Sequence, residues 1–155
     1  MGTGLRRRIK QEHFTSAQQE ALLNLSVAAN YLRERSERVV EAFEITLPQY
    51  NVLRILRGIH PDGHPRGEIA QRMLDRAPDV TRIVDRLEAK KLVSRDRGGN
   101  DRRQSITRIT REGLKLLDRM DAPMQKAFDE VAQHLAAHDC RELSRLCELI
   151  YDAAV

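Results

Sequence analysis

Apolar residues recur at alternating steps of three and four along the N-terminal third of the chain, which is the spacing of one helix face. Ser16 precedes this series and Gln19 follows it by three residues, which is the capping-box pattern. We therefore expect a helix of roughly 28 residues, about 42 Å long. A helix this long must lie against another long partner. The series is Leu22, Leu25, Ala29, Leu32, Val39 and Phe43, with Ser36 in its polar slot.

A second apolar stripe runs through the C-terminal third, where Asp121 interrupts it and Pro123 is expected to kink the helix. Asp139 and Glu142 form a capping box for a short final helix. The stripe contains Leu114, Leu117, Met124, Phe128, Val131 and Leu135, and the final helix contains Leu143, Leu146, Cys147 and Ile150.

One small central domain cannot cover both seams, so the pattern favours a helical bundle shared by two copies of the chain. Bundling within one monomer is the alternative. The residues expected at the dimer interface are Leu22, Leu25, Leu32, Phe128, Leu135, Leu143, Leu146 and Ile150.

The middle of the chain predicts shorter elements. Thr46 caps a helix with Pro48 in its first turn, and Leu53 and Leu56 give its buried face. A turn-rich loop covers 60–65, and a short helix is expected over 67–74. Its inward residues are expected to be Ile69, Ala70, Met73 and Leu74.

A brief turn at 75–77 leads to Pro78, which suits the first position of a helix running to about Lys91. Two short helices joined by a tight turn make a helix-turn-helix candidate. On a wheel of ~100° per residue, one face of the second helix is apolar and must point to the core. That face holds Val80, Ile83, Val84 and Leu87, and the opposite face holds Pro78, Thr81, Arg82, Asp85, Arg86 and Ala89.

The outward face has the shape and charge to enter a DNA major groove. Thr81 can contact a thymine methyl or hydrogen-bond, Arg82 can fork onto guanine N7 and O6, and Arg86 can reach a phosphate. Asp79 favours the helix N-terminus, and Asp85 is expected to orient Arg82 or to accept from cytosine N4. The alternative is an ordinary solvated face.

After Lys91 the pattern changes to that of a β-hairpin. The segment 92–97 reads as a strand, 98–101 as a Gly-rich turn, and 102–110 as the returning strand. Arg97, Arg102 and Arg103 cluster at its tip, like a wing whose arginine enters a narrow minor groove. Thr110 is expected to cap the C-terminal helix.

Composition supports one mostly helical domain, or one compact module with an oligomerisation arm. The chain has 155 residues, 41% of them apolar and 32% charged, which excludes wholesale disorder. No apolar run is long enough to span a membrane, and no hydrophobic stretch follows the basic N-terminus as in a signal peptide. With two cysteines, the chain is no disulfide scaffold, and a cytoplasmic location is expected.

Positive charge is concentrated in the middle of the chain. Residues 48–110 hold 14 basic and 8 acidic side chains, whereas residues 111–155 hold 6 and 9. Most of the basic residues are arginines, whose guanidinium groups bind phosphate and guanine bidentately. A high-GC genome explains an excess of arginine equally well, but it does not explain the clustering.

Other chemistry is weakly indicated. His60 and His64 have no supporting Cys or carboxylate cluster, so no metal is expected. Cys140 and Cys147 are two helical turns apart, about 10 Å, too far for an intrachain disulfide. They are expected to be packing residues, with an intersubunit disulfide or thiol sensor as the alternative. No catalytic triad or nucleotide-binding loop is present, so neither an enzyme nor a cofactor is expected.

Three blocks in the right order resemble the MarR family of winged-helix transcription regulators. Residues 76–88 resemble its recognition helix, 47–53 the opening of the helix before it, and 92–95 with 101–103 and 109–113 its wing and exit. The family often has Gly where Lys91 stands. The outer helices match the family only in length and order.

The resemblance implies a mainly α protein with a small β-wing, in which a winged helix-turn-helix domain (46–111) lies between dimerisation helices (1–45 and 112–155). It implies a homodimer on a pseudo-palindromic DNA operator, acting as a repressor that is released by a small aromatic or phenolic effector. Asp101 would position Arg103 in the minor groove. A winged-helix protein–protein adaptor is the alternative. The expected DNA-binding residues are Arg76, Pro78, Asp79, Thr81, Arg82, Asp85, Arg86, Arg97, Asp101, Arg102 and Arg103.

Overall fold

Helix α3 (Leu47–Gly58) begins as the sequence predicts, because Thr46 and Gln49 form a reciprocal capping box. The Thr46 backbone N–H donates to Gln49 Oε1 at 2.9 Å, and the Gln49 N–H donates to Thr46 Oγ1 at 3.4 Å. Leu53 and Leu56 on this helix are fully buried. This capping box thus starts the first helix of the central domain at the predicted residue.

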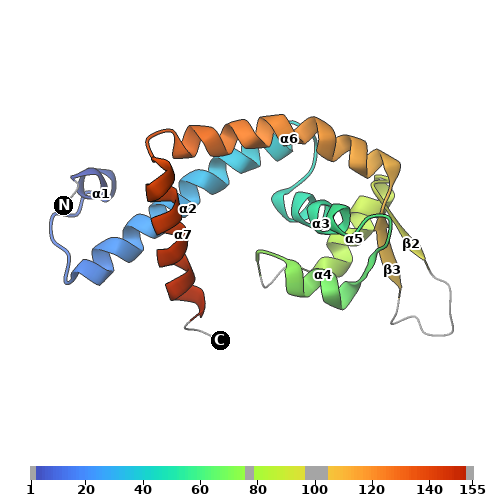
Figure 1. Cartoon of the computed structure of the whole chain (residues 1–155), viewed down its shortest axis with the longest axis horizontal. Helices are drawn as coiled ribbons and strands as arrows, with labels where there is room; N and C mark the ends of the chain where they lie inside the picture. Colours follow the sequence, from blue (N-terminus) through green and yellow to red (C-terminus); the bar gives the residue numbers. More distant parts are fainter. Residues whose placement is uncertain (1–2, 76–78, 97–104, 153–155) are drawn as a thin grey trace. The chain divides into compact units, whose positions relative to one another are not determined.

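The computed structural model describes residues 3–75, 79–96 and 105–152. Figure 1 shows these elements along the chain. In chain order they are α1 (Gly4–Ile9), α2 (Ala17–Glu41), α3, β1 (His64–Pro65), α4 (Arg66–Arg72), α5 (Val80–Ala89), β2 (Val93–Asp96), β3 (Ile106–Ile109), α6 (Arg111–Ala132) and α7 (Ala137–Tyr151). They form two compact units, one of residues 36–125 and one of residues 1–35 with 126–155.

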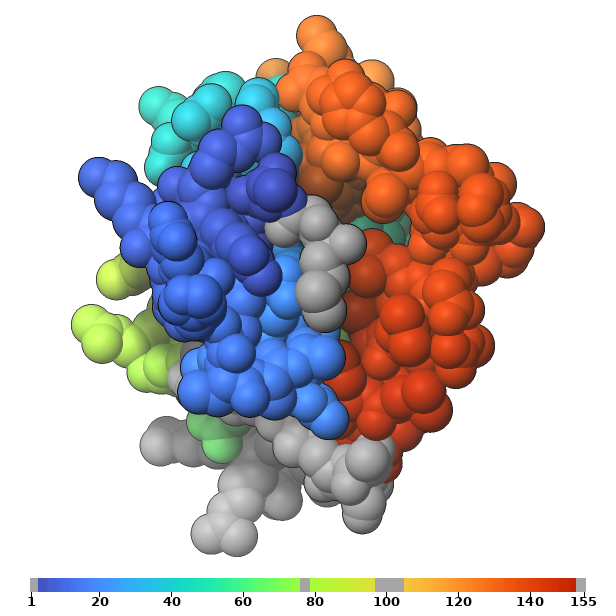
Figure 2. All heavy atoms as spheres, turned by 90° about the vertical axis from the view of Figure 1, so that its left-hand side faces the viewer, coloured from blue at the N-terminus to red at the C-terminus, as the bar shows by residue number. Residues whose placement is uncertain are grey.

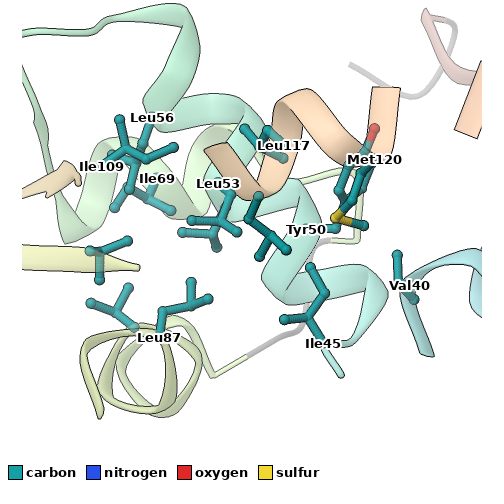
Figure 3. Close-up of a cluster of buried hydrophobic side chains, with 14 of the residues drawn as sticks. Val40, Ile45, Tyr50, Leu53, Leu56, Ile69, Leu87, Ile109, Leu117 and Met120 are labelled. Atoms are coloured by element: carbon teal, nitrogen blue, oxygen red, sulfur yellow. The ribbon is translucent and has the colours of Figure 1, made fainter. Parts of the chain in front are cut away.

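The central unit is built around one apolar core. Side chains of α3, α4, α5, β3 and α6 converge there, as Figure 3 shows for Leu53, Ile69, Leu87, Ile109 and Leu117. All five come from positions that the sequence pattern predicts to be apolar or in a strand, and all five are at most 5% exposed. Because α3 and α4 both contact α5, the core fixes the helix that carries the expected DNA-binding residues.

The sheet of this unit has the strand order β1-β3-β2, with both pairs antiparallel. Val93 lies opposite Ile109 and Arg95 opposite Thr107, and the apolar pair faces the core. The predicted hairpin is therefore confirmed in its described part. The two-residue strand β1 was expected to be loop, and Gly63 before it has no room for a side chain because a Cβ would lie 2.3 Å from Thr107 O.

Two residues expected in the core of α4 are exposed instead. Leu74 is 88% exposed. The helix ends at Arg72, and Met73 has an extended backbone (ψ 140°), which takes Leu74 off the buried face. Ala70 is also exposed, because it lies ~100° around the helix from buried Ile69.

The ends of two other helices differ from expectation. Helix α5 begins at Val80 with Asp79 as its N-cap, later than predicted, and Pro78 lies outside the described residues. Helix α7 begins at Ala137, which makes Asp139 its third residue rather than its cap. The Asp139 carboxylate still serves the helix start, because Oδ2 accepts from the Ala136 N–H at 2.9 Å.

Helix α6 confirms the capping role of Thr110, whose Oγ1 accepts from the Gly113 N–H at 3.1 Å. The helix continues through Pro123 to Ala132. Its most buried side chains near the middle are Leu117, Met120 and Met124. Met120 therefore belongs to the buried stripe, although it was not among the residues predicted for it. Asp121 pairs with Arg57 of α3 at 2.9 Å, which ties these two helices together.

The other unit contains all eight predicted dimerisation residues. Figure 2 shows its N-terminal segment in blue beside its C-terminal helix in red. Arg35 of α2 pairs with Glu130 of α6 at 3.3 Å, and Ser16 Oγ caps the start of α2 by accepting from the Gln19 N–H. Helix α1, buried only through Leu5, was not predicted from the sequence.

Candidate nucleic-acid interface

The side chain of Asp79, the residue just before α5, caps the N-terminus of that helix. Asp79 Oδ1 accepts from the Arg82 N–H at 3.2 Å, which satisfies one of the helix's free amide groups. Its carboxylate also lies at the positive end of the helix dipole. Asp79 therefore serves to start the helix, in line with its expected preference for this end.

The two faces of α5 are divided as the helical wheel predicts. Val80, Val84 and Leu87 are buried and Ile83 is partly buried, so the apolar face packs on the core. The opposite face is exposed to solvent and carries two arginines. Its described members are Thr81, Arg82, Asp85, Arg86 and Ala89. Because the buried side is fixed by packing, this exposed side is presented in one orientation.

Asp85 has a partner that the sequence did not suggest. Its Oδ1 receives a hydrogen bond from Arg95 Nη2 on strand β2, rather than one from Arg82. Arg95 Nε also lies 3.5 Å from Glu88 Oε2, one turn further along α5. The arginine side chain is only 18% exposed, so it is held between two carboxylates. This contact joins β2 to α5 and offsets negative charge beside Arg82 and Arg86.

Arg66 is a second residue that sequence reasoning missed. It is the first residue of α4, and its Nη1 donates to Thr81 Oγ1 on α5 at 3.1 Å. Both side chains are exposed. The only signal in the sequence was its position beside the start of the predicted 67–74 helix, in the basic middle of the chain, which does not reveal a contact 15 positions away.

The turn between α4 and α5 is held from α3. Asn51 Oδ1 accepts from the Leu74 backbone N–H at 3.0 Å. This bond fixes the chain just after α4 although the Leu74 side chain is in solvent. The three helices α3, α4 and α5 are thus joined by packing and by polar contacts, and Figure 1 shows them grouped beside β2 and β3.

Helix α5 ends at its C-terminus with Lys91 in the position where the family often has glycine. Lys91 adopts a left-handed backbone with φ 59°, the conformation that usually selects glycine. Its N–H donates to Glu88 O at 2.8 Å, and the Leu92 N–H donates to Leu87 O at 3.0 Å. These two bonds are the Schellman motif. The helix therefore ends as it would with glycine, at the cost of placing a lysine there.

The connection from α5 into the sheet is fixed by further bonds. Thr110 Oγ1 donates to Lys91 O at 2.8 Å, and the Thr110 N–H donates to Leu92 O at 3.1 Å. The neighbouring Lys90 donates from Nζ to Glu44 O at 2.6 Å, where α2 has ended. Strand β2 thus leaves α5 in a direction set by hydrogen bonds on both sides.

The outer part of the predicted wing is outside the described residues. At its described base, Arg108 Nη1 lies 3.4 Å from Asp96 Oδ2, across the β2–β3 pair. Six expected DNA-binding residues are outside the described ranges: Arg76, Pro78, Arg97, Asp101, Arg102 and Arg103.

Two further observations concern charge and ligands. The bidentate hydrogen bond from Arg57 to Asp121 raises the pKa of Arg57 above its ordinary value, with burial opposing the shift. Among the described residues, no group of three or more His, Cys, Asp or Glu side chains is arranged to hold a metal ion. Within the same residues, no helix has the length and hydropathy needed to cross a membrane.

Three consecutive helices, α3, α4 and α5, followed by the antiparallel strands β2 and β3, define the winged helix-turn-helix class of domain. The model of the MarR family matches residues 45–105, which span the elements from α3 to β2 and end just before β3. A crystal structure of a MarR transcription factor from Planctomyces limnophilus is 39% identical, covers 88% of this chain and 99% of its own, and has a TM-score of 0.70. The chain belongs to the MarR family of transcriptional regulators.

Two other relatives are more distant. The homoprotocatechuate degradative operon repressor of Escherichia coli is 29% identical over 130 residues, 83% of each chain. The structure of Bordetella bronchiseptica BpsR, whose DNA binding is regulated by 6-hydroxynicotinic acid, is 19% identical with a TM-score of 0.75, covering 85% of this chain and 98% of that one. Because the family consists of transcription factors, this protein is a transcriptional regulator and not an enzyme.

Proposed function

We propose that the protein binds a pseudo-palindromic operator in the cytoplasm as a homodimer and represses transcription. Helix α5 of each subunit enters a major groove, and each wing enters a neighbouring minor groove. Thr81, Arg82 and Arg86 contact bases and phosphates from α5. Arg103 acts from the wing, with Asp101 as its positioning partner.

The observation that carries this proposal is the exposed face of α5. Arg82 and Arg86 stand on it, while the nearby carboxylates of Asp85 and Glu88 are engaged by Arg95. Because Arg95 offsets the charge of these two carboxylates, the exposed face of α5 is predominantly positive. Arginines in this setting bind guanine edges and phosphates bidentately.

The dimer is supported by apolar side chains that one chain leaves exposed. Leu143, Leu146 and Ile150 on α7 are 45–50% exposed, and Leu22 on α2 is 51% exposed. Phe128, Leu32 and Leu135 are 37–43% exposed. So many large apolar side chains left in solvent favour a protein-interaction surface in this unit. A second copy covers it in the proposal, with 1–45 and 112–155 as dimerisation segments and 46–111 as the DNA-binding domain.

The effector is proposed to be a small hydroxylated aromatic acid. One relative is a repressor of a homoprotocatechuate degradative operon, and the DNA binding of another is regulated by 6-hydroxynicotinic acid. A ligand that favours one spacing of the two α5 helices shifts the dimer toward that spacing. Release from DNA follows if that spacing differs from ~34 Å, one turn of the double helix.

Fluorescence anisotropy on two duplexes tests the proposal. One duplex carries the DNA upstream of the protein's own gene, and the other has the same base composition in random order. A regulator binds the first more tightly, and its affinity falls on the order of a thousandfold between about 50 and about 200 mM salt. Equal affinity for both duplexes indicates the sequence-blind adaptor instead. Adding 6-hydroxynicotinic acid or homoprotocatechuate to the complex then tests the effector class.

A further inference from the structure

The bond between Arg66 and Thr81 bears on which bases the protein selects. Arg66 lies on α4, the helix before the recognition helix, and Thr81 is the second residue of α5. Their side chains meet at 3.1 Å from Nη1 to Oγ1, and both are on the solvent side of the domain. Packing of α4 on α5 through the core fixes the distance between the two backbones.

The chemistry of the two side chains decides which one donates the hydrogen bond. A hydroxyl has one hydrogen to donate and two lone pairs that accept. Guanidinium can only donate, so Thr81 Oγ1 must be the acceptor in this bond. The guanidinium charge repels the hydroxyl hydrogen, which turns it away from Arg66. Thr81 then offers a donor to whatever approaches the exposed face of α5.

We propose that Arg66 is a specificity-determining positioning residue, which holds the Thr81 hydroxyl as a hydrogen-bond donor toward an acceptor on a base edge. This inference rests on the proposed entry of α5 into the major groove. The acceptors available there are N7 of either purine, O6 of guanine and O4 of thymine, whereas the N4 amino group of cytosine is a donor. The base that Thr81 meets is therefore one with an acceptor edge and not cytosine.

A mutant cycle separates this role from simple attraction to phosphate. Thr81→Val removes the hydroxyl and keeps a methyl group. Arg66→Lys keeps the positive charge but replaces the planar fork with a flexible ammonium. Arg72→Lys is the matched control, because Arg72 is also exposed on α4 and, among the described residues, bonds within that helix, to Glu68 at 3.1 Å. Each variant selects binding sites from a random duplex library, and the preference at every position is read by sequencing.

In the wild-type background, Thr81→Val is expected to reduce the preference at one position of each half-site by about fivefold, the effect of one ordinary hydrogen bond. Arg66→Lys reduces the preference at the same position, and adding Thr81→Val to it changes the preference by less than about twofold. Arg72→Lys leaves it unchanged.

Two results would overturn the inference while leaving the proposed function intact. In one, Arg66→Lys weakens binding to all sequences equally and Thr81→Val keeps its full effect. In the other, Thr81→Val leaves the preference at every position unchanged. Failure of the wild-type protein to select any sequence overturns the proposed function itself, and the inference with it.

Discussion

Replacing Lys91 with glycine is expected to stabilise the protein. Lys91 has φ 59°, and a residue with a Cβ pays about 1–2 kcal/mol to adopt the left-handed conformation. Glycine avoids that cost but loses about 0.5–1 kcal/mol more backbone entropy on folding. Both hydrogen bonds of the Schellman motif come from backbone groups and survive the change. The net gain in the free energy of unfolding is therefore between about 0 and 1.5 kcal/mol, with a central value of about 0.75 kcal/mol.

Ala89→Gly is the matched control, because Ala89 is exposed and is the last helical residue of α5. Here glycine brings no relief, and the expected loss is about 1 kcal/mol. Urea unfolding followed by circular dichroism, at one fixed protomer concentration, measures both changes from the shift in midpoint at constant slope. A lower midpoint for Lys91→Gly would refute the reasoning, since it would mean that Lys91 bears no conformational cost.

Three further predictions concern DNA binding and dimerisation. Arg82→Ala should cost about 1–3 kcal/mol of operator affinity and relax base preference, whereas Arg103→Ala should weaken binding to all duplexes alike; anisotropy on operator and random DNA separates these patterns. Arg95→Met should lower the free energy of unfolding by about 1 kcal/mol and weaken operator binding, because two carboxylates on α5 lose their cation; unchanged binding would show that these carboxylates do not affect DNA. Leu146→Glu should yield monomers in sedimentation, whereas Arg141→Glu, also exposed on α7, should stay dimeric; a dimer in both would exclude this face of α7 from the interface.

Periodicity and capping predicted most of the central domain because they depend on residues close in sequence. Thr46 with Gln49 started α3, and Val80, Val84 and Leu87 marked the buried face of α5. Both features follow from backbone geometry within one or two helical turns. The exposed face of α5 followed by elimination, since a helix packed on one side must present the other.

The polar contacts between elements were not predictable in the same way. Arg66 meets Thr81, and Arg95 meets Asp85, only after α4, α5 and β2 have packed. The sequence offered Arg82 as a nearer partner for Asp85, but side chains three positions apart on one helix compete with partners brought by the fold. The predicted burial of Leu74 was wrong for a related reason. An apolar residue at helical spacing indicates burial only if the helix continues to it, and α4 ends at Arg72.

Hydroxyl-radical footprinting on a selected duplex is the decisive test of dimeric DNA binding through α5, because it reports contact, spacing and symmetry together. Two protected half-sites are expected, centred about 10 base pairs apart and related by a two-fold axis, as a dimer with one α5 helix per major groove requires. A single protected half-site, or protection without two-fold symmetry, would contradict it.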